Sequence, residues 1–250
     1  MNKHEKELDE ILFDVIDVSK KLNIKLWLEA GTLLGLERNN NFIPWEKDID
    51  FGSWNYDFTN KKYNLFKKTL QNRKYIVTKK FNKSNNLITI KKNKFTCTGD
   101  IAIYKKKKDI AYFKLIPIPI TTKGKFLKRL HNIINTKKIF NELKLHKLGI
   151  IKIIYIIIHY LFKFFTSLHF KNYFIKYLKK KINLNSKDIS WKVPLNFLIK
   201  VKRKKFRGLD VYVPYKSIEY LKFRYGKNWR KPRSDWNQFK EDRTMIDLNK

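Results

Sequence analysis

Two aspartates separated by one residue, Asp48 and Asp50, are the side chains of this sequence best suited to chemistry. The run Asp48-Ile49-Asp50-Phe51 predicts a short strand, with both carboxylates on one face and Ile49 and Phe51 in the core. Two carboxylates held so close repel each other unless a cation lies between them. Hard divalent cations prefer such oxygen ligands. The pattern therefore indicates a metal site, with two solvated acids on a strand edge as the alternative.

A third carboxylate, Asp100, opens an apolar run in a segment that is otherwise almost free of acids. Between residues 58 and 187 the other acidic residues are Asp109 and Glu142. An acid at a strand start in so basic a segment suggests a function, although a plain strand-edge acid is the alternative. Asp100 is therefore a candidate partner of Asp48 and Asp50.

The elements that must position these side chains follow from the periodicity of apolar residues. Residues 3–22 carry apolar side chains at helical spacing, which predicts an amphipathic helix. Residues 26–28 are typical of a buried strand, and Gly31-Thr32 interrupts it before a helical turn. Further expected elements are a helix over 57–71, strands over 75–81, 87–91, 95–98, 100–104 and 110–116, and a strand or hairpin over 204–214.

The residues around the two-aspartate motif resemble the LicD/fukutin family of phosphotransferases. That family shows a GTLLG block, an arginine, an IPW or IPY block and then D-x-D. The matching residues here are Gly31-Thr32-Leu33-Leu34-Gly35, Arg38, Ile43-Pro44-Trp45 and Asp48-Ile49-Asp50. Lys47 stands where many members carry an acid, a departure that fukutin-like members share. The resemblance covers residues 24–104 and 204–236.

The resemblance implies an α/β (α+β) fold, with a nucleotidyltransferase-like, polymerase-beta-type mixed sheet core. It also implies that the motif aspartates hold metal and that a third carboxylate comes from a neighbouring strand, where Asp100-Ile101-Ala102 resembles a family block. We therefore expect Asp48, Asp50 and Asp100 to be catalytic residues that bind Mg²⁺ or Mn²⁺.

Six further residues are candidates for substrate binding: Glu29, Gly31, Thr32, Arg38, Lys47 and Arg207. Gly31 and Thr32 offer N–H groups at a helix start, which suit an anionic oxygen. Arg38 could neutralise donor phosphate, with a loop salt bridge as the alternative. Glu29 could join the metal site, orient a ligand or be structural.

The chain is expected to form a catalytic core over 1–120, a basic, apolar helical insertion over 121–190 and a C-terminal segment over 191–250 that completes the core. Within the insertion, residues 148–165 are strongly apolar but carry Lys152, His159 and Lys163 on one narrow helical stripe. Such a helix could lie in a membrane interface or in the core of the insertion. Both interpretations stay open.

The 250 residues carry a net charge of +35, and 48 lysines outnumber 9 arginines. Nucleic-acid recognition usually favours arginine, and an AT-rich genome also produces many lysines. The single cysteine, Cys97, excludes a disulfide framework and a cysteine-based zinc site and suggests a reducing compartment. The charged N-terminus lacks the apolar region of a signal peptide. We expect a cytoplasmic protein, with attachment to the inner face of an anionic membrane left open.

The expected activity is metal-dependent transfer of phosphocholine or a polyol phosphate from a CDP-linked donor to a hydroxyl of a glycan or lipid-linked oligosaccharide. One alternative is a nucleotidyltransferase that acts on RNA or protein. Another is a basic nucleic-acid-binding module without catalysis. Residues 1–60, which carry the motif, are the acidic part of the chain, and this disfavours direct binding of a nucleic-acid backbone there.

Overall fold

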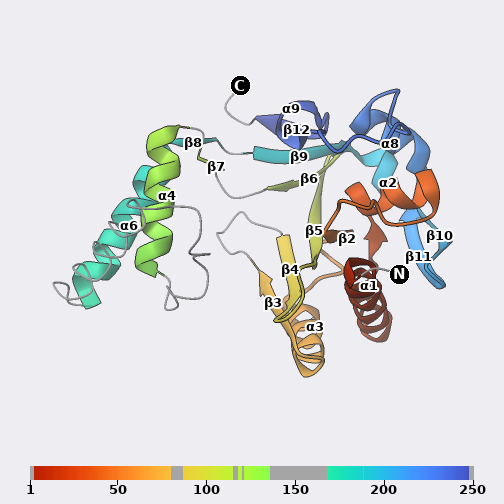
Figure 1. The fold of residues 1–250 in the computed structure, drawn as a ribbon, viewed down its shortest axis with the longest axis horizontal. Coiled ribbons are helices and arrows are strands. Elements are labelled where there is room, and N and C mark those ends of the chain that lie inside the picture. Colours follow the sequence, from red (N-terminus) through yellow and green to blue (C-terminus); the bar gives the residue numbers. More distant parts are fainter. Residues whose placement is uncertain are drawn as a thin grey trace. The chain divides into compact units, whose positions relative to one another are not determined.

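The computed structural model describes residues 3–79, 87–114, 118–119, 121–135, 168–187 and 189–247 (Figure 1). The chain divides into two compact units. Unit 1 comprises Met1–Ile116 and Ile189–Asp247, and unit 2 comprises Pro117–Asp188 and Leu248–Lys250. The two-aspartate motif and Asp100 belong to unit 1, so this unit positions the candidate site.

Unit 1 is built on a ten-stranded mixed sheet with the order β10-β11-β1-β2-β5-β6-β9-β12, in which β4 also pairs with β5 and β3 pairs with β4. β2 is parallel to β5 and β1 is parallel to β11, whereas the other pairs are antiparallel. This architecture confirms the expected mixed α/β class. The strands are β1 (Trp27–Leu28), β2 (Asp48–Trp54), β3 (Tyr75–Lys79), β4 (Leu87–Lys92), β5 (Thr98–Lys107), β6 (Ile110–Lys114), β9 (Ile189–Pro194), β10 (Val201–Phe206), β11 (Leu209–Pro214) and β12 (Met245–Asp247).

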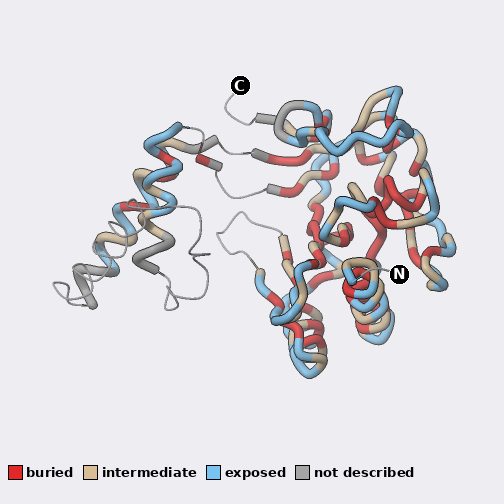
Figure 2. Tube along the Cα trace, viewed as in Figure 1, coloured by how far each residue is buried: buried red, intermediate tan, exposed pale blue. Residues whose placement is uncertain are grey.

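Helices pack against this sheet through apolar faces that the sequence encodes. Helix α1 buries Leu8, Ile11, Leu12 and Val15, a spacing that marks one helical face, and Figure 2 shows the contrast between its buried and exposed sides. A Cβ at Gly99 would come within 3.0 Å of Ile11 Cγ2, so the glycine permits close contact between α1 and β5. The helices are α1 (Lys3–Lys21), α2 (Ala30–Asn39), α3 (Asn60–Asn72), α7 (Leu195–Leu198), α8 (Ser217–Tyr225) and α9 (Gln238–Glu241).

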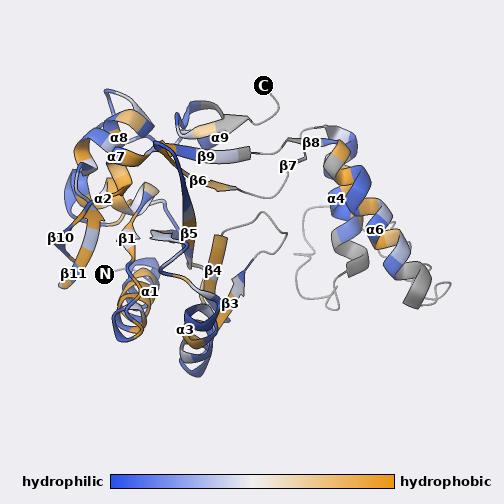
Figure 3. Cartoon of the chain, turned by 180° about the vertical axis from the view of Figure 1, so that it is seen from behind, coloured by the Kyte–Doolittle hydropathy of each residue, from blue (hydrophilic) through white to orange (hydrophobic). Residues whose placement is uncertain are grey.

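Unit 2 contains a helical hairpin of α4 (Thr122–Asn135) and α6 (Leu168–Leu184), with the short antiparallel strands β7 (Ile118–Pro119) and β8 (Ser186–Lys187). Apolar and hydrophilic residues alternate along both helices (Figure 3). No helix among the described residues is both long and apolar enough to cross a membrane. The stretch 148–165 lies outside the described residues.

One predicted strand, residues 95–98, is wrong. A turn at 93–94 is followed by an irregular segment over 95–97, and β5 begins only at Thr98. The reason lies in α1, because Glu7 Oε2 accepts hydrogen bonds from the Thr96 N–H (2.8 Å), the Cys97 N–H (3.0 Å) and the Thr96 hydroxyl (3.0 Å). These bonds satisfy backbone donors that a strand partner would otherwise satisfy.

Candidate active site

Strand β2 carries the two-aspartate motif, and β5 places a third acid beside it. The strands run parallel, with Asp50 in register with Asp100. Residues in register on neighbouring strands project from the same face of a sheet. Along β2, Ile49 and Phe51 are buried, whereas Asp48 and Asp50 are partly exposed. Asp48, Asp50 and Asp100 all line one cavity of about 370 Å³, so the structure brings the three predicted metal ligands together.

The N-terminus of α2 holds Asp50 in position. The Gly31 N–H donates to Asp50 Oδ2 (3.1 Å), and the Asp50 N–H donates to Thr32 Oγ1 (2.9 Å). The free N–H groups and the positive dipole end of a helix attract an anion, and the anion that Gly31 meets is a carboxylate of the protein itself. Gly31 lines the cavity, whereas Thr32 is buried. The first residues of α2 therefore hold the acidic strand in position.

A fourth acid, Glu46, which was not among the predicted site residues, lines the same cavity. A Cβ at Gly31 would lie 3.4 Å from Asp50 Oδ2 and 3.5 Å from Glu46 Oε1, so both carboxylates approach one point. Burial raises the pKa of Glu46 to about 7, with the neighbouring charge of Asp48 and a hydrogen bond to it adding to the rise. The signal in the sequence was the alternate spacing of Glu46, Asp48 and Asp50, which puts three acids on one side of an extended chain.

Mutual repulsion among these acids shapes the electrostatics of the cavity. Burial raises the pKa of Asp50 well above its usual value, and the charges of Asp48, Asp100 and Glu46 raise it further, while Arg224 opposes them. Carboxylate oxygens are the ligand type that Mg²⁺ and Mn²⁺ prefer, although within the described part of the chain no three of these acids place a ligand oxygen within 4.8 Å of one another. The residue types suit a hard divalent cation by their chemistry, and the acids would have to move closer together to bind one.

Cationic and aromatic side chains line other parts of the cavity. Arg38 lies in the last turn of α2, and burial lowers its pKa. Its Nε is buried without a hydrogen-bond partner in the described part of the chain. An arginine N–H in that state suits an anionic oxygen of a ligand. The other cationic and aromatic lining residues are Arg224, Lys231, Arg233, Trp45, Phe51, Tyr104, Phe113, Trp191, Tyr225, Trp229 and Trp236.

Glu29 borders the cavity, but its carboxylate is engaged by the protein. Oε2 accepts from Trp27 Nε1 (2.8 Å), and Oε1 accepts from the Tyr220 hydroxyl and from Arg224 Nη1 (3.2 Å). Arg224 also contacts Asp242 Oδ2 at 2.9 Å. Burial raises the pKa of Glu29, and the charge of Arg224 opposes that rise. This buried network connects β1 to α8 and the C-terminal segment, so the arrangement gives Glu29 a structural role.

Two of the expected substrate-binding residues lie away from this cavity. Lys47 is exposed, and as the neighbour of Asp48 in an extended chain it lies on the opposite side from that acid. The charge of Lys47 lowers the pKa of the Cys97 thiol, against the larger effect of burial. Arg207 follows β10 and forms a paired contact with Asp9 of α1, at 2.8 Å and 2.6 Å. Arg207 Nη1 also donates to Asn41 Oδ1 (3.1 Å). The structure thus separates Lys47 and Arg207 from the acids.

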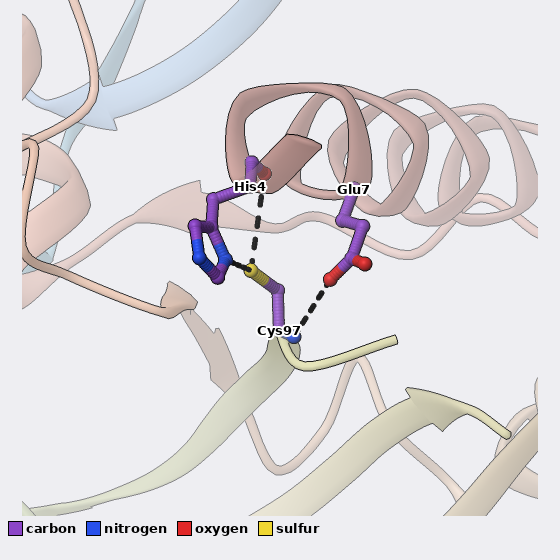
Figure 4. Close-up of side chains that lie close together, drawn as sticks. All are labelled: His4, Glu7 and Cys97. Carbon is purple, nitrogen blue, oxygen red and sulfur yellow. Dashed lines mark hydrogen bonds between the residues drawn. The ribbon is translucent and has the colours of Figure 1, made fainter. Parts of the chain in front are cut away.

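A second group of possible metal ligands lies at the start of α1. His4, Glu7 and Cys97 each offer a ligand atom, and among the described residues these three atoms lie within 4.8 Å of one another. Figure 4 shows the hydrogen bonds that join Cys97 to both other residues. Glu7 Oε2 already accepts three hydrogen bonds, and burial raises the pKa of the Cys97 thiol. We interpret the group as a clamp that holds the start of β5.

Sequence comparison relates the chain to known proteins. The profile of the LicD/FKTN/FKRP nucleotidyltransferase domain matches residues 23–149. The uncharacterized protein RP689 of Rickettsia prowazekii is 40% identical over 50 residues, which are 20% of this chain and 19% of that protein. Ribitol 5-phosphate transferase FKRP of Homo sapiens is 39% identical over 46 residues, which are 18% of this chain and 9% of that protein. The chain therefore spans only a small part of each relative, but its family profile covers half of the chain. This protein belongs to the LicD/FKTN/FKRP family.

Proposed function

We propose that this protein is a metal-dependent phosphotransferase with a polymerase-beta-type core. It transfers phosphocholine or a polyol phosphate from a CDP-linked donor to a hydroxyl of a glycan or glycolipid. The observation that carries the proposal is one cavity lined by Asp48, Asp50, Asp100 and Arg38. The Arg38 Nε has no hydrogen-bond partner among the residues that the structure describes. Membership of the family and the similarity to a ribitol 5-phosphate transferase support the same class of reaction.

Asp48, Asp50 and Asp100 are the residues that would hold Mg²⁺ or Mn²⁺. A bound ion of this kind offsets negative charge on the donor phosphates and on the departing nucleotide. Gly31 and Thr32 contribute by fixing Asp50 through its carboxylate and its backbone N–H. Arg38 binds a phosphate oxygen through its Nε–H, which meets no acceptor in the described part of the chain.

In the proposed transfer, the acceptor hydroxyl oxygen forms a bond to the donor phosphorus that carries the small group. The bond from that phosphorus to the bridging oxygen breaks, and CMP leaves with the bridging oxygen. A cavity carboxylate accepts the proton of the hydroxyl. Because little covalent chemistry falls to the protein, most of its contribution is positioning and charge stabilisation.

Donor-dependent CMP release tests the proposal, with CDP-choline, CDP-ribitol and CDP-glycerol as donors and a glycan acceptor. We expect turnover that requires Mg²⁺ or Mn²⁺. Asp50→Asn keeps the acceptor for the Gly31 N–H and should lower turnover by roughly 100-fold or more, since metal coordination contributes several kcal/mol. Asp109→Asn, at an exposed acid outside the cavity, is the matched control.

The alternatives predict other products. A nucleotidyltransferase would release pyrophosphate from a nucleoside triphosphate and extend RNA or label protein. A basic nucleic-acid-binding module would bind RNA without metal and lose it at moderate salt. Tight RNA binding at high salt, with none of the CDP-linked donors consumed, would refute the phosphotransferase assignment.

We also propose a cytoplasmic location with peripheral attachment to the inner face of a membrane. The support is the composition of residues 117–188, where lysine is abundant and Glu142 and Asp188 are the only acids. Anionic lipid attracts such segments.

A further inference from the structure

The helical hairpin of unit 2 carries positive charge without compensating acids. Residues 121–135 and 168–187, which include α4 and α6, contain no aspartate or glutamate. Their basic residues are lysines apart from Arg129. A surface of one charge sign attracts a partner of the opposite sign, so this hairpin suits an anionic partner.

The two helices bury their main apolar faces against each other. Leu178 and Ile182 of α6 are buried, and Leu127, Leu130 and Phe174 pack against them. A Cβ at Gly124 would come within 2.8 Å of Asn185 Cβ, which shows how closely the start of α4 approaches the end of α6. The outward residues of α6 are therefore not needed for the core of the hairpin.

Those outward residues nevertheless include large apolar side chains. One side of α6 carries five residues spaced at intervals of one, three or four, namely Tyr173, Lys176, Tyr177, Lys180 and Leu184. Tyr173 is 68% exposed and Leu184 is 72% exposed. Lysines with aromatic and aliphatic side chains between them are typical of a helix that lies in a membrane interface.

We propose that the outer face of α6, defined by these five residues, binds the anionic headgroup surface of a membrane, with the exposed lysines of α4 assisting. The lysine ammonium groups contact lipid phosphates while Tyr173, Tyr177 and Leu184 enter the headgroup layer. The excess of lysine over arginine favours lipid over nucleic acid, where the planar guanidinium is usually preferred. This attachment does not depend on the proposed transfer reaction.

Sedimentation of the full chain with lipid vesicles tests the proposal. Binding should be strong on phosphatidylcholine vesicles that contain phosphatidylglycerol, weak on phosphatidylcholine alone, and reduced by salt. Lys176→Gln/Lys180→Gln should weaken binding roughly 30-fold, because each lysine near an anionic surface contributes about fivefold. Lys61→Gln/Lys68→Gln removes the same charge from exposed positions of α3 and should leave binding nearly unchanged.

A second variant tests the apolar component. Tyr173→Ser/Leu184→Ser keeps every charge and should weaken vesicle binding several-fold. An unchanged affinity would overturn the insertion of these side chains. Three results would overturn the proposal that this face binds a membrane. The first is an equal loss of vesicle binding in the α3 control, and the second is equal binding to uncharged vesicles. The third is polyuridylate binding that the α6 lysine variant abolishes while its vesicle binding persists.

Discussion

Arg224→Met is the substitution expected to destabilise unit 1 most, because Arg224 is the cation between two buried acids. Its guanidinium lies 3.2 Å from Glu29 Oε1 and 2.9 Å from Asp242 Oδ2. The three side chains are 7%, 4% and 0% exposed in the order Arg224, Glu29 and Asp242, so water cannot replace the lost partner. Removing one member of a buried ion pair typically costs about 3–5 kcal/mol, a large part of an ordinary stability of about 5–15 kcal/mol.

Urea unfolding followed by tryptophan fluorescence measures this loss. All 6 tryptophans lie in unit 1, so the signal reports that unit. Trp27 and Trp191 donate directly to Glu29 and Asp242, which makes the emission sensitive to the network. With a slope of about 2 kcal/mol per molar urea, the unfolding midpoint should fall by about 2 M.

Two companion variants separate charge from packing. Arg224→Lys keeps the charge, but a single ammonium does not bond both carboxylates as a guanidinium does, so an intermediate loss is expected. Arg243→Met, at an exposed arginine nearby in the sequence, should change the unfolding free energy by less than about 0.5 kcal/mol. If Arg224→Met costs under about 1 kcal/mol, the two carboxylates do not depend on this cation and the reasoning fails.

Three further changes test other contacts. Gly52→Ala places a Cβ 2.3 Å from the Trp27 ring, and the overpacking should cost about 2–3 kcal/mol; an unchanged urea midpoint would contradict this. Glu7→Ala leaves the Thr96 and Cys97 N–H groups without their acceptor and should cost about 1–3 kcal/mol. Urea unfolding measures this loss, and a cost under about 0.5 kcal/mol would contradict the role of the clamp. Arg73→Gln removes the hydrogen bond that lowers the pKa of Asp17. The bond stabilises the folded protein fully above the pKa of Asp17 in the unfolded chain, about 3.9. This stabilisation is lost as the pH falls through the lower pKa of Asp17 in the folded protein. Calorimetry should therefore show that the substitution lowers the unfolding free energy by about 1 kcal/mol at neutral pH and has no effect in acid.

Local patterns in the sequence were sufficient for many of the elements and for the central motif, but not for residues 95–98. The apolar spacing in residues 3–22 predicted α1, and the alternation from Asp48 to Phe51 predicted which side chains of β2 are buried. Helices and strands repeat every 3.6 and 2.0 residues, so a short stretch of sequence contains their signal. The family blocks around Gly31-Thr32 and Asp48 were likewise contiguous, and the family assignment was correct.

Contacts between distant segments needed the tertiary structure. Asp100 faces the cavity because β5 is in parallel register with β2, and no local pattern encodes the register of strands about fifty residues apart. Glu29 pairs with Arg224 of α8, and Arg207 pairs with Asp9 of α1. These charges therefore stabilise the fold. Glu46 shared the alternate spacing of the motif, but its importance depends on burial beside Asp48. Sequence spacing thus determined which face each acid occupies, while sheet order and burial decided which charges line the cavity and which pair with each other.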